Sequence, residues 1–98
     1  MNVSFRFSAL DFVWDQRKAD ANLKKHGIAF ETACEIFLDP FIRFIGNQSV
    51  GNEERGTAIG MTEDWKLLKV VYVFNPEQIR LVSARPVTIQ ERRHYEEQ

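Results

Sequence analysis

The sequence predicts an α+β domain in which two N-terminal helices precede a twisted antiparallel sheet and one helix follows it, with the helices covering one face as a second layer. Two observations carry this prediction. Residues 16–37 and 89–97 have helical spacing and capping signals, whereas residues 41–85 form β-prone runs separated by short polar turns. Loops this short favour antiparallel pairing. The 98 residues contain no repeat or linker, and two cores would each be too small, so residues 1–98 are expected to form one domain.

The N-terminal segment is expected to hold a strand and then a helix. Residues 3–7 alternate apolar and polar side chains and residues 12–14 are β-prone, which together predict one short N-terminal strand. Asp15 stands at an N-cap position, where its carboxylate can accept hydrogen bonds from the free amides of the first turn. Residues 16–26 are mostly good helix formers, and Gly27 supplies the left-handed residue that ends the helix.

A second helix is predicted after this glycine. Apolar residues recur at helical spacing from Phe30 to Phe37. We expect a helix of about two turns that continues to Asp39, because Pro40 disfavours helical conformation in the residue before it.

The middle of the chain predicts four strands, at residues 41–45, 55–61, 67–74 and 79–85. By composition, residues 47–52 form a loop, residues 62–64 a turn and residues 75–77 a hairpin connection. The run at residues 67–74 is apolar on both faces apart from Lys69, so we expect it at the centre of the sheet.

A capping box predicts the start of a C-terminal helix. The Thr88 hydroxyl would accept from the Glu91 amide, while the Glu91 carboxylate reaches back to the Thr88 amide. This pattern predicts a helix over residues 89 to about 97.

Composition excludes several classes of protein. Hydrophobic residues make up 44% of the chain and charged residues 28%, which indicates a folded protein and not a disordered one. No run approaches the roughly 18 consecutive apolar residues of a membrane helix, and the N-terminus does not resemble a signal peptide, so we expect a soluble, cytoplasmic protein without a membrane partner. The single cysteine, Cys34, cannot form an intramolecular disulfide, and a thiolate metal site would need companions. No metal or cofactor is predicted.

The charge balance gives no strong attraction to nucleic acid as a whole, because 13 Lys and Arg oppose 14 Asp and Glu. A local basic patch remains compatible with this balance. The chain also lacks a Gly-rich phosphate loop, a His-x-x-x-His pair and a Ser or Cys beside an evident base, which argues against nucleotide hydrolysis, zinc hydrolysis and triad chemistry. The remaining candidates are basic residues near the ends of elements: Lys18, Lys25, His26, Arg55, Arg80, Arg85, Arg92 and Arg93.

The first helix offers one candidate anion site. Lys18, Asn22 and Lys25 follow helical spacing and share a polar edge with His26. His26 lies in the last turn, where the helix dipole favours its protonated form and suits a proton donor or a phosphate contact. The alternative is that both lysines are solvated surface and that His26 only caps the helix.

A second candidate site gathers arginines from the predicted sheet. Arg55, Arg80 and Arg85 could approach each other across paired strands and bind phosphate through two nitrogens each. Strict alternation places Arg80 and Arg85 on opposite faces, so both join one site only if a bulge or a strand end intervenes. The alternative is that these arginines are ordinary charges of the sheet surface, paired with Glu53, Glu54 or Glu91.

The motifs in order resemble the BrnT family of bacterial toxins, which are related in fold to RelE-like ribonucleases. No single motif is diagnostic, whereas their order and spacing over nearly the whole chain are specific. The helical half carries Phe12-x-Trp14-Asp15-x-x-Lys18, Asn22-x-x-Lys25-His26-Gly27, Phe30-Glu31-x-Ala33 and Phe37-x-Asp39-Pro40. The β half carries Glu54-Arg55, Ile59-Gly60, Val70-Val71-Tyr72, Arg80-x-x-Ser83-Ala84-Arg85 and Glu91-Arg92-x-x-Tyr95.

The resemblance implies a RelE-like two-layer domain with metal-independent endoribonuclease activity that arrests translation. It also implies a BrnA-like antitoxin, which forms a heterotetramer with the toxin and binds promoter DNA. In this family the promoter is contacted only through the antitoxin.

Two classes of function follow. In the first, the ribose 2′-hydroxyl attacks the adjacent phosphorus while the protein transfers protons and stabilises charge. The expected catalytic residues are His26, Glu54, Arg55 and Arg80, and the expected RNA contacts are Lys18, Lys25, Ser83, Arg85, Arg92 and Tyr95. In the second, the chain is a non-catalytic interaction module that binds a DNA-binding partner protein. In either case the partner is expected to cover the basic groove, with apolar residues of the strand at residues 41–45 extending the contact.

Overall fold

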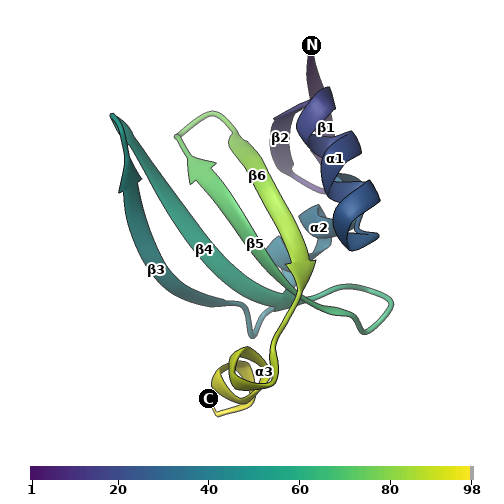
Figure 1. The fold of residues 1–98 in the computed structure, drawn as a ribbon, viewed down its shortest axis with the longest axis vertical. Coiled ribbons are helices and arrows are strands. Elements are labelled where there is room, and N and C mark those ends of the chain that lie inside the picture. Colours follow the sequence, from purple (N-terminus) through teal and green to yellow (C-terminus); the bar gives the residue numbers. More distant parts are fainter. Residues whose placement is uncertain (98) are drawn as a thin grey trace.

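The computed structural model describes residues 1–97, which form one six-stranded sheet with helices around it (Figure 1). The N-terminal half holds β1 (Asn2–Phe7), β2 (Leu10–Asp15), α1 (Gln16–His26), α2 (Phe30–Ala33) and the 3₁₀ helix η1 (Cys34–Leu38). The C-terminal half holds β3 (Arg43–Val50), β4 (Glu53–Met61), β5 (Leu67–Phe74), β6 (Ile79–Pro86) and α3 (Ile89–Glu96). The α+β class is confirmed.

The prediction that two helices come first was wrong, because the chain begins with a β-hairpin. β1 and β2 pair antiparallel around a two-residue turn at Ser8 and Ala9, with Phe7 opposite Leu10. Ser8 adopts a positive φ of 56° in this turn. Tight hairpin turns usually carry Asn-Gly or Asp-Gly at these positions, so the sequence lacked the ordinary signal and the two strands were interpreted as one.

The sheet is mixed and not purely antiparallel as predicted. Its strand order is β1-β2-β6-β5-β4-β3, and β2 lies parallel to β6 over the pairs Phe12–Ile79 and Val13–Arg80. All other neighbouring pairs are antiparallel. β2 carries the buried side chains of Phe12 and Trp14 into the core next to β6. The interior position predicted for β5 is confirmed.

The first helix is confirmed in its bounds and in both caps. The Asp15 carboxylate accepts from the amides of Arg17 at 2.8 Å and Lys18 at 3.3 Å, and these bonds lower the pKa of Asp15. Gly27 ends α1 with a φ of 72°. The second predicted helix is helical over the expected residues but changes from α to 3₁₀ geometry at Cys34.

The predicted loop at residues 47–52 is largely strand. β3 continues to Val50, which pairs with Glu53, so only Gly51 and Asn52 turn the chain. Gly51 has the positive φ of 63° that such a two-residue hairpin turn uses. The loop was predicted because the sequence of this stretch is polar and has a weak intrinsic β preference. Pairing with β4 overrides that preference and makes the stretch a strand.

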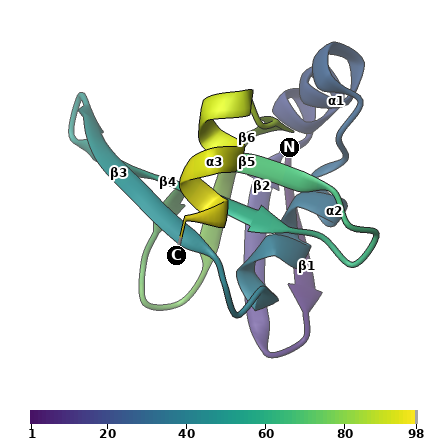
Figure 2. The ribbon, with the colours of Figure 1, turned by 90° about the horizontal axis from the view of Figure 1, so that it is seen from below.

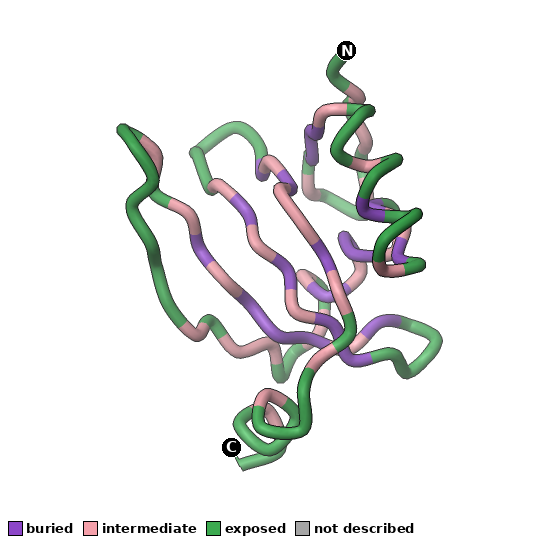
Figure 3. The backbone as a smooth tube through the Cα atoms, viewed as in Figure 1, coloured by how far each residue is buried: buried purple, intermediate pink, exposed green. Residues whose placement is uncertain are grey.

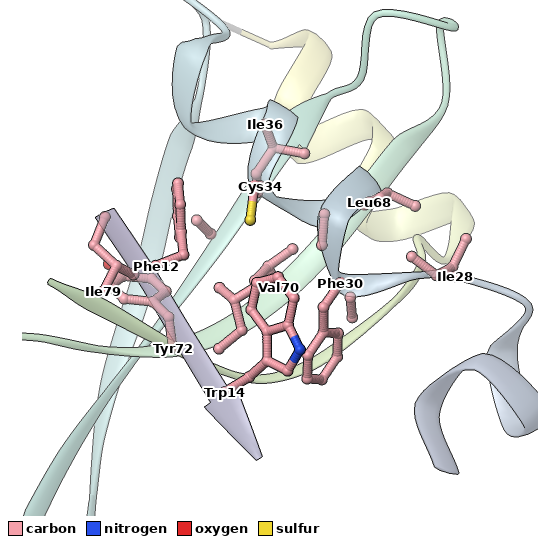
Figure 4. Packing of buried hydrophobic residues seen from close by; sticks show 14 residues of the cluster. Phe12, Trp14, Ile28, Phe30, Cys34, Ile36, Leu68, Val70, Tyr72 and Ile79 are labelled. Carbon is pink, nitrogen blue, oxygen red and sulfur yellow. The ribbon is translucent and has the colours of Figure 1, made fainter. Parts of the chain in front are cut away.

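The core lies between the sheet, η1 and the N-terminal hairpin (Figure 4). Trp14 packs edge-on against Phe30 with ring centroids 5.7 Å apart, and Phe37 packs edge-on against Tyr72 at 5.4 Å. Gly60 allows η1 to approach β4, since a Cβ at this position would lie 2.7 Å from the Cβ of Ile36. Packed aromatic rings therefore contribute to the stability of this small domain.

The prediction that the helices cover one face as a second layer was also wrong. α2 and η1 lie on the core side of the sheet, whereas α1 runs beside β6 and α3 lies at the lower end of the sheet on the opposite side (Figures 1 and 2). α3 buries none of its residues, and both helices are mostly exposed (Figure 3). Their sequences are too polar to cover a core, and the β1–β2 hairpin supplies Phe12 and Trp14 in their place. The layout therefore departs from the RelE-like arrangement expected.

One buried side chain attaches α1 to the sheet. The Asn22 amide donates to the carbonyl oxygens of Ile28 at 2.9 Å and Ala84 at 2.8 Å, and its oxygen accepts from the Ala84 amide at 3.0 Å. Asn22 thus occupies both backbone groups of Ala84 on the edge of β6 that faces away from β5. This part of the edge lies beyond the short contact with β2.

Candidate functional site

The four strands β3–β6 present a face on the side opposite the core, between α1 and α3, which we call the open face (Figure 1). Directly paired residues share a face of a sheet, so the pairing identifies its members. Val71 pairs with Thr57 on one side and with Ser83 on the other, and Lys69 pairs with Ile59 and with Arg85. By alternation, Arg55 and Glu53 of β4 lie on the same face.

A β-bulge in β6 turns both of its arginines to the open face. Val73 pairs with Arg80 and Tyr72 with Leu81, after which Val71 pairs with Ser83, so Val82 is the extra residue. The five-residue spacing from Arg80 to Arg85 would otherwise place them on opposite faces. The bulge therefore puts Arg80, Ser83 and Arg85 on the same face of the sheet as Arg55.

The upper end of the open face holds a three-residue ionic cluster, Glu53, Arg55 and Arg80. One oxygen of Glu53 accepts from Arg55 Nε at 3.1 Å, and the other forms a short hydrogen bond with Arg80 Nη2. The two arginine hydrogen bonds, that of Arg55 foremost, lower the pKa of Glu53. All three side chains keep about a third of their surface exposed, at 36%, 28% and 31% respectively, so a ligand can reach them.

The lower end, beside α3, holds a second ionic cluster, Arg85, Glu91 and Lys69. Arg85 donates two parallel hydrogen bonds to Glu91, at 2.9 and 2.8 Å, and Lys69 Nζ lies 3.8 Å from the same carboxylate. Glu91 also accepts from the Thr88 amide and completes the predicted capping box, which is confirmed. These bonds, first the one from Arg85, lower the pKa of Glu91 to about 2, and the same ion pair raises the pKa of Arg85.

A shallow groove of about 300 Å³ runs between α1 and β6. Its lining includes Lys18, Lys25 and His26 from the helix and Val82 and Ser83 from the bulge. The groove thus places the basic edge of α1 beside the open face.

The second histidine of the chain also borders the open face. His94 of α3 lies 3.3 Å from Arg43 through its Nε2 atom. Arginine has only donors, so in this contact the Nε2 atom of His94 is the acceptor. Next to it, the Tyr95 hydroxyl donates to Asp39 at 2.6 Å, and burial together with this bond raises the pKa of Tyr95 to about 12.

The structure gathers most of the predicted site residues and separates others. Around the open face it brings together Lys18, Lys25, His26, Arg55, Arg80, Ser83 and Arg85. Glu54 lies on the other face of β4, where it accepts from Ser49 at 2.8 Å. Arg92 is exposed on α3 and lies 3.9 Å from Glu96. Tyr95 is bound to Asp39 and takes a structural position.

Sequence reasoning missed Glu53 and His94 as site residues. Glu53 has the same alternation parity as Arg55, which places it on the arginine face, but the predicted strand began only at Arg55. His94 was interpreted as exposed helix surface, and no sequence signal links it to Arg43.

Two other observations concern metals and membranes. Within residues 1–97 there is no group of three or more His, Cys, Asp or Glu that could hold a metal ion. The same residues form no helix that is long and apolar enough to span a bilayer.

Comparison with known proteins places the chain in a family. A family model described as "Ribonuclease toxin, BrnT, of type II toxin-antitoxin system" matches residues 14–91. The fold is similar to the 1.1 Å crystal structure of the Brucella abortus ribonuclease toxin BrnT, with a TM-score of 0.62 and 23% identity, covering 76% of this chain and 92% of that chain. No curated protein matches in sequence. Because the family model spans most of the chain, the protein belongs to the BrnT family of type II toxin–antitoxin ribonuclease toxins.

Proposed function

We propose that this protein is a metal-independent endoribonuclease that cleaves RNA lying across its open face and thereby arrests translation. The ribose 2′-hydroxyl attacks the adjacent phosphorus and forms a 2′,3′-cyclic phosphate, while the 5′-oxygen of the next nucleotide leaves with a proton. The substrate supplies the nucleophile, so the protein has to bind phosphate, stabilise negative charge and move two protons.

The observation that carries this proposal is the bulge at Val82. Bulges re-aim side chains next to functional sites, and this one puts Arg80 and Arg85 on the one face that also holds Arg55. Two guanidinium groups, each able to donate several hydrogen bonds, then face one surface. Such a pair suits the charge that develops on a phosphate during cleavage.

Proton transfer falls to the histidines. His26, in the groove between α1 and β6, is our first candidate for acid or base, since Lys18 and Lys25 beside it would hold a neighbouring phosphate. His94 is the second candidate, because it borders the open face beside Arg43. Glu54 is set apart from the arginines by its position on the other face of β4.

Two hollows beside the N-terminal hairpin are poorer RNA sites. Both include Asp11 and Glu77 in their lining, and only one contains a basic residue, Arg6, which is paired with Asp11 at 3.0 Å. Negative charge at these positions would repel phosphate.

The antitoxin that this family implies would act by covering the open face. A BrnA-like partner that forms a heterotetramer and carries the DNA-binding surface would exclude RNA by overlap and bind promoter DNA itself. The competing interpretation is an interaction module that binds such a partner and has no catalytic activity.

Incubation of the purified chain with a defined RNA and the matching DNA, each with and without EDTA, separates these functions. We expect RNA alone to be cut, in EDTA as well, with 2′,3′-cyclic phosphate ends. His26→Ala and His94→Ala, assayed in parallel, identify the proton-transfer residue by a loss of about 10²-fold or more. Absence of cleavage by a folded parent protein would favour the interaction module, and cleavage that stops in EDTA would overturn the metal-independent mechanism.

A further inference from the structure

The ionic cluster at the upper end of the open face joins residues from strands that are not neighbours. Arg55 lies on β4 and Arg80 on β6, with β5 between them. Arg80 pairs with Val73, and continuation of the register that pairs Gly56 with Tyr72 places Arg55 beside Val73 on the other side. Their backbones are therefore about two strand spacings, roughly 10 Å, apart. Only long side chains that lean toward each other can meet over this distance. Glu53 is the residue at which they meet.

The hydrogen bonds to Glu53 leave most of both guanidinium groups available. Glu53 engages Nε of Arg55 and one terminal nitrogen of Arg80. The remaining donors of these two arginines have no hydrogen-bond partner among residues 1–97. Both terminal nitrogens of Arg55 and one edge of Arg80 are therefore free for a ligand that offers several acceptor oxygens, as a phosphate does.

Two arginines this close would repel each other without a counterion, and each would sample many rotamers. One carboxylate that accepts from both removes the repulsion and fixes both side chains. The cluster keeps one net positive charge, so it still attracts an anion.

We propose that Glu53 is a positioning residue, which holds Arg55 and Arg80 as a paired clamp for one phosphate group of the RNA. This inference rests on the proposed RNA-cleaving function and deepens it, because it assigns the phosphate site and the residue that organises it. Glu53 acts through the two arginines and does not take up a proton itself.

The main rival is that Glu53 is the general base of the reaction. Both of its oxygens already accept hydrogen bonds from guanidinium groups. These bonds hold its pKa below the ordinary value, and a base works best when its pKa is near the working pH. The second rival is simple surface electrostatics, in which Glu53 only lowers the positive charge that RNA meets.

Glu53→Gln distinguishes these alternatives when kcat, KM and the pH profile of RNA cleavage are measured together with binding of a non-cleavable 2′-O-methyl oligonucleotide. We expect kcat to fall about 10-fold through lost arginine positioning, with the shape of the pH profile unchanged and affinity for the oligonucleotide not weakened. Glu77→Gln removes the same charge from the exposed hairpin at the same end of the sheet and should leave kcat unchanged. Thermal melting confirms that each variant is folded.

A double-mutant cycle with Arg80→Ala adds a readout that a passive surface charge would not move. We expect Glu53→Gln to have almost no further effect on kcat once Arg80 is removed. An unchanged kcat in the single variant, additive effects in the cycle, or loss of the acidic limb of the pH profile would each overturn the inference. A parent protein that does not cleave RNA would instead reject the proposed function, and the inference with it.

Discussion

The two ionic clusters of the open face, one around Glu53 and one around Glu91, have the same kinds of residues but differ in how their hydrogen bonds are used. In both, one glutamate joins two basic residues of the sheet. Glu91 is only 19% exposed, accepts two parallel bonds from Arg85 and also caps α3, so its oxygens are committed to the fold. Glu53 is 36% exposed and accepts one bond from each arginine, and its carboxylate has no further hydrogen bond among residues 1–97.

The difference shows how to separate a structural ion pair from a functional one on a single surface. A bidentate pair that also satisfies a helix terminus uses up the donors it holds. A carboxylate shared by two arginines that each give it one hydrogen bond fixes both side chains while leaving most of their donors available. The lower cluster therefore stabilises the attachment of α3, and the upper cluster is suited to a ligand.

The largest expected effect is a loss of RNA cleavage in a variant of Arg80, which a variant of Arg85 should not share. Arg80→Ala should lower RNA cleavage by about 10²-fold or more, a scale typical of a lost charge-stabilising group, with little change in stability. Arg85→Ala should instead lower the free energy of unfolding by about 1 kcal/mol, because its partner Glu91 is partly buried. Steady-state kinetics and urea unfolding of both variants check this. If both variants lost the same amount of activity and neither lost stability, the proposed difference between the two clusters would be wrong.

An intermediate effect concerns acid stability. The folded-state pKa of Glu91 is about 2, below its ordinary 4.5, so the unfolded chain binds the proton more tightly. The stabilisation by Glu91 is therefore complete above pH 4.5 and is lost as the pH falls toward 2. We expect it to be about 2 kcal/mol at neutral pH after solvent screening. Urea unfolding between these pH values should show a smaller pH dependence in Glu91→Gln, and an unchanged dependence would contradict the assignment.

The smallest effect tests the cap alone. Thr88→Ala removes the hydroxyl that accepts from the Glu91 amide at 3.2 Å. We expect a loss of about 1 kcal/mol in unfolding free energy, with the Arg85–Glu91 pair retained. Thr88→Ser, which keeps the hydroxyl, serves as the control in the same denaturation experiment. If both variants lose equally, the methyl group of Thr88 matters and the cap does not.

The sequence predicted those features that short-range rules govern. Asp15 and Gly27 bound α1, Thr88 and Glu91 cap α3, and the run of β5 marks the centre of the sheet, because each signal lies within a few residues of its effect. The N-terminal hairpin was not predicted, because Ser8 takes the positive φ of its turn in place of the usual glycine. The parallel contact of β2 with β6 depends on residues more than 60 positions apart, for which a single sequence offers no signal.

The same division holds for the candidate site. Arg55 and Arg80 could be named from residue type, but whether Arg80 and Arg85 share a face depended on a bulge that the sequence did not locate. Glu54 was named as a proton acceptor directly before Arg55. Neighbouring residues of a strand point to opposite faces, so Glu53 shares the face of Arg55 and Glu54 does not. The geometry therefore decided which glutamate belongs to the site.

Asn22 has a consequence for how the molecule avoids self-association. An uncovered sheet edge offers its backbone groups to the edge of another molecule. Beyond the short contact with β2, the backbone groups of Ala84 are occupied by one amide side chain. Detachment of α1 would uncover a stretch of β6 that can template intermolecular strand pairing. The helix that carries Lys18, Lys25 and His26 therefore also covers part of a sheet edge, so its detachment would favour aggregation as well as disturb the candidate site.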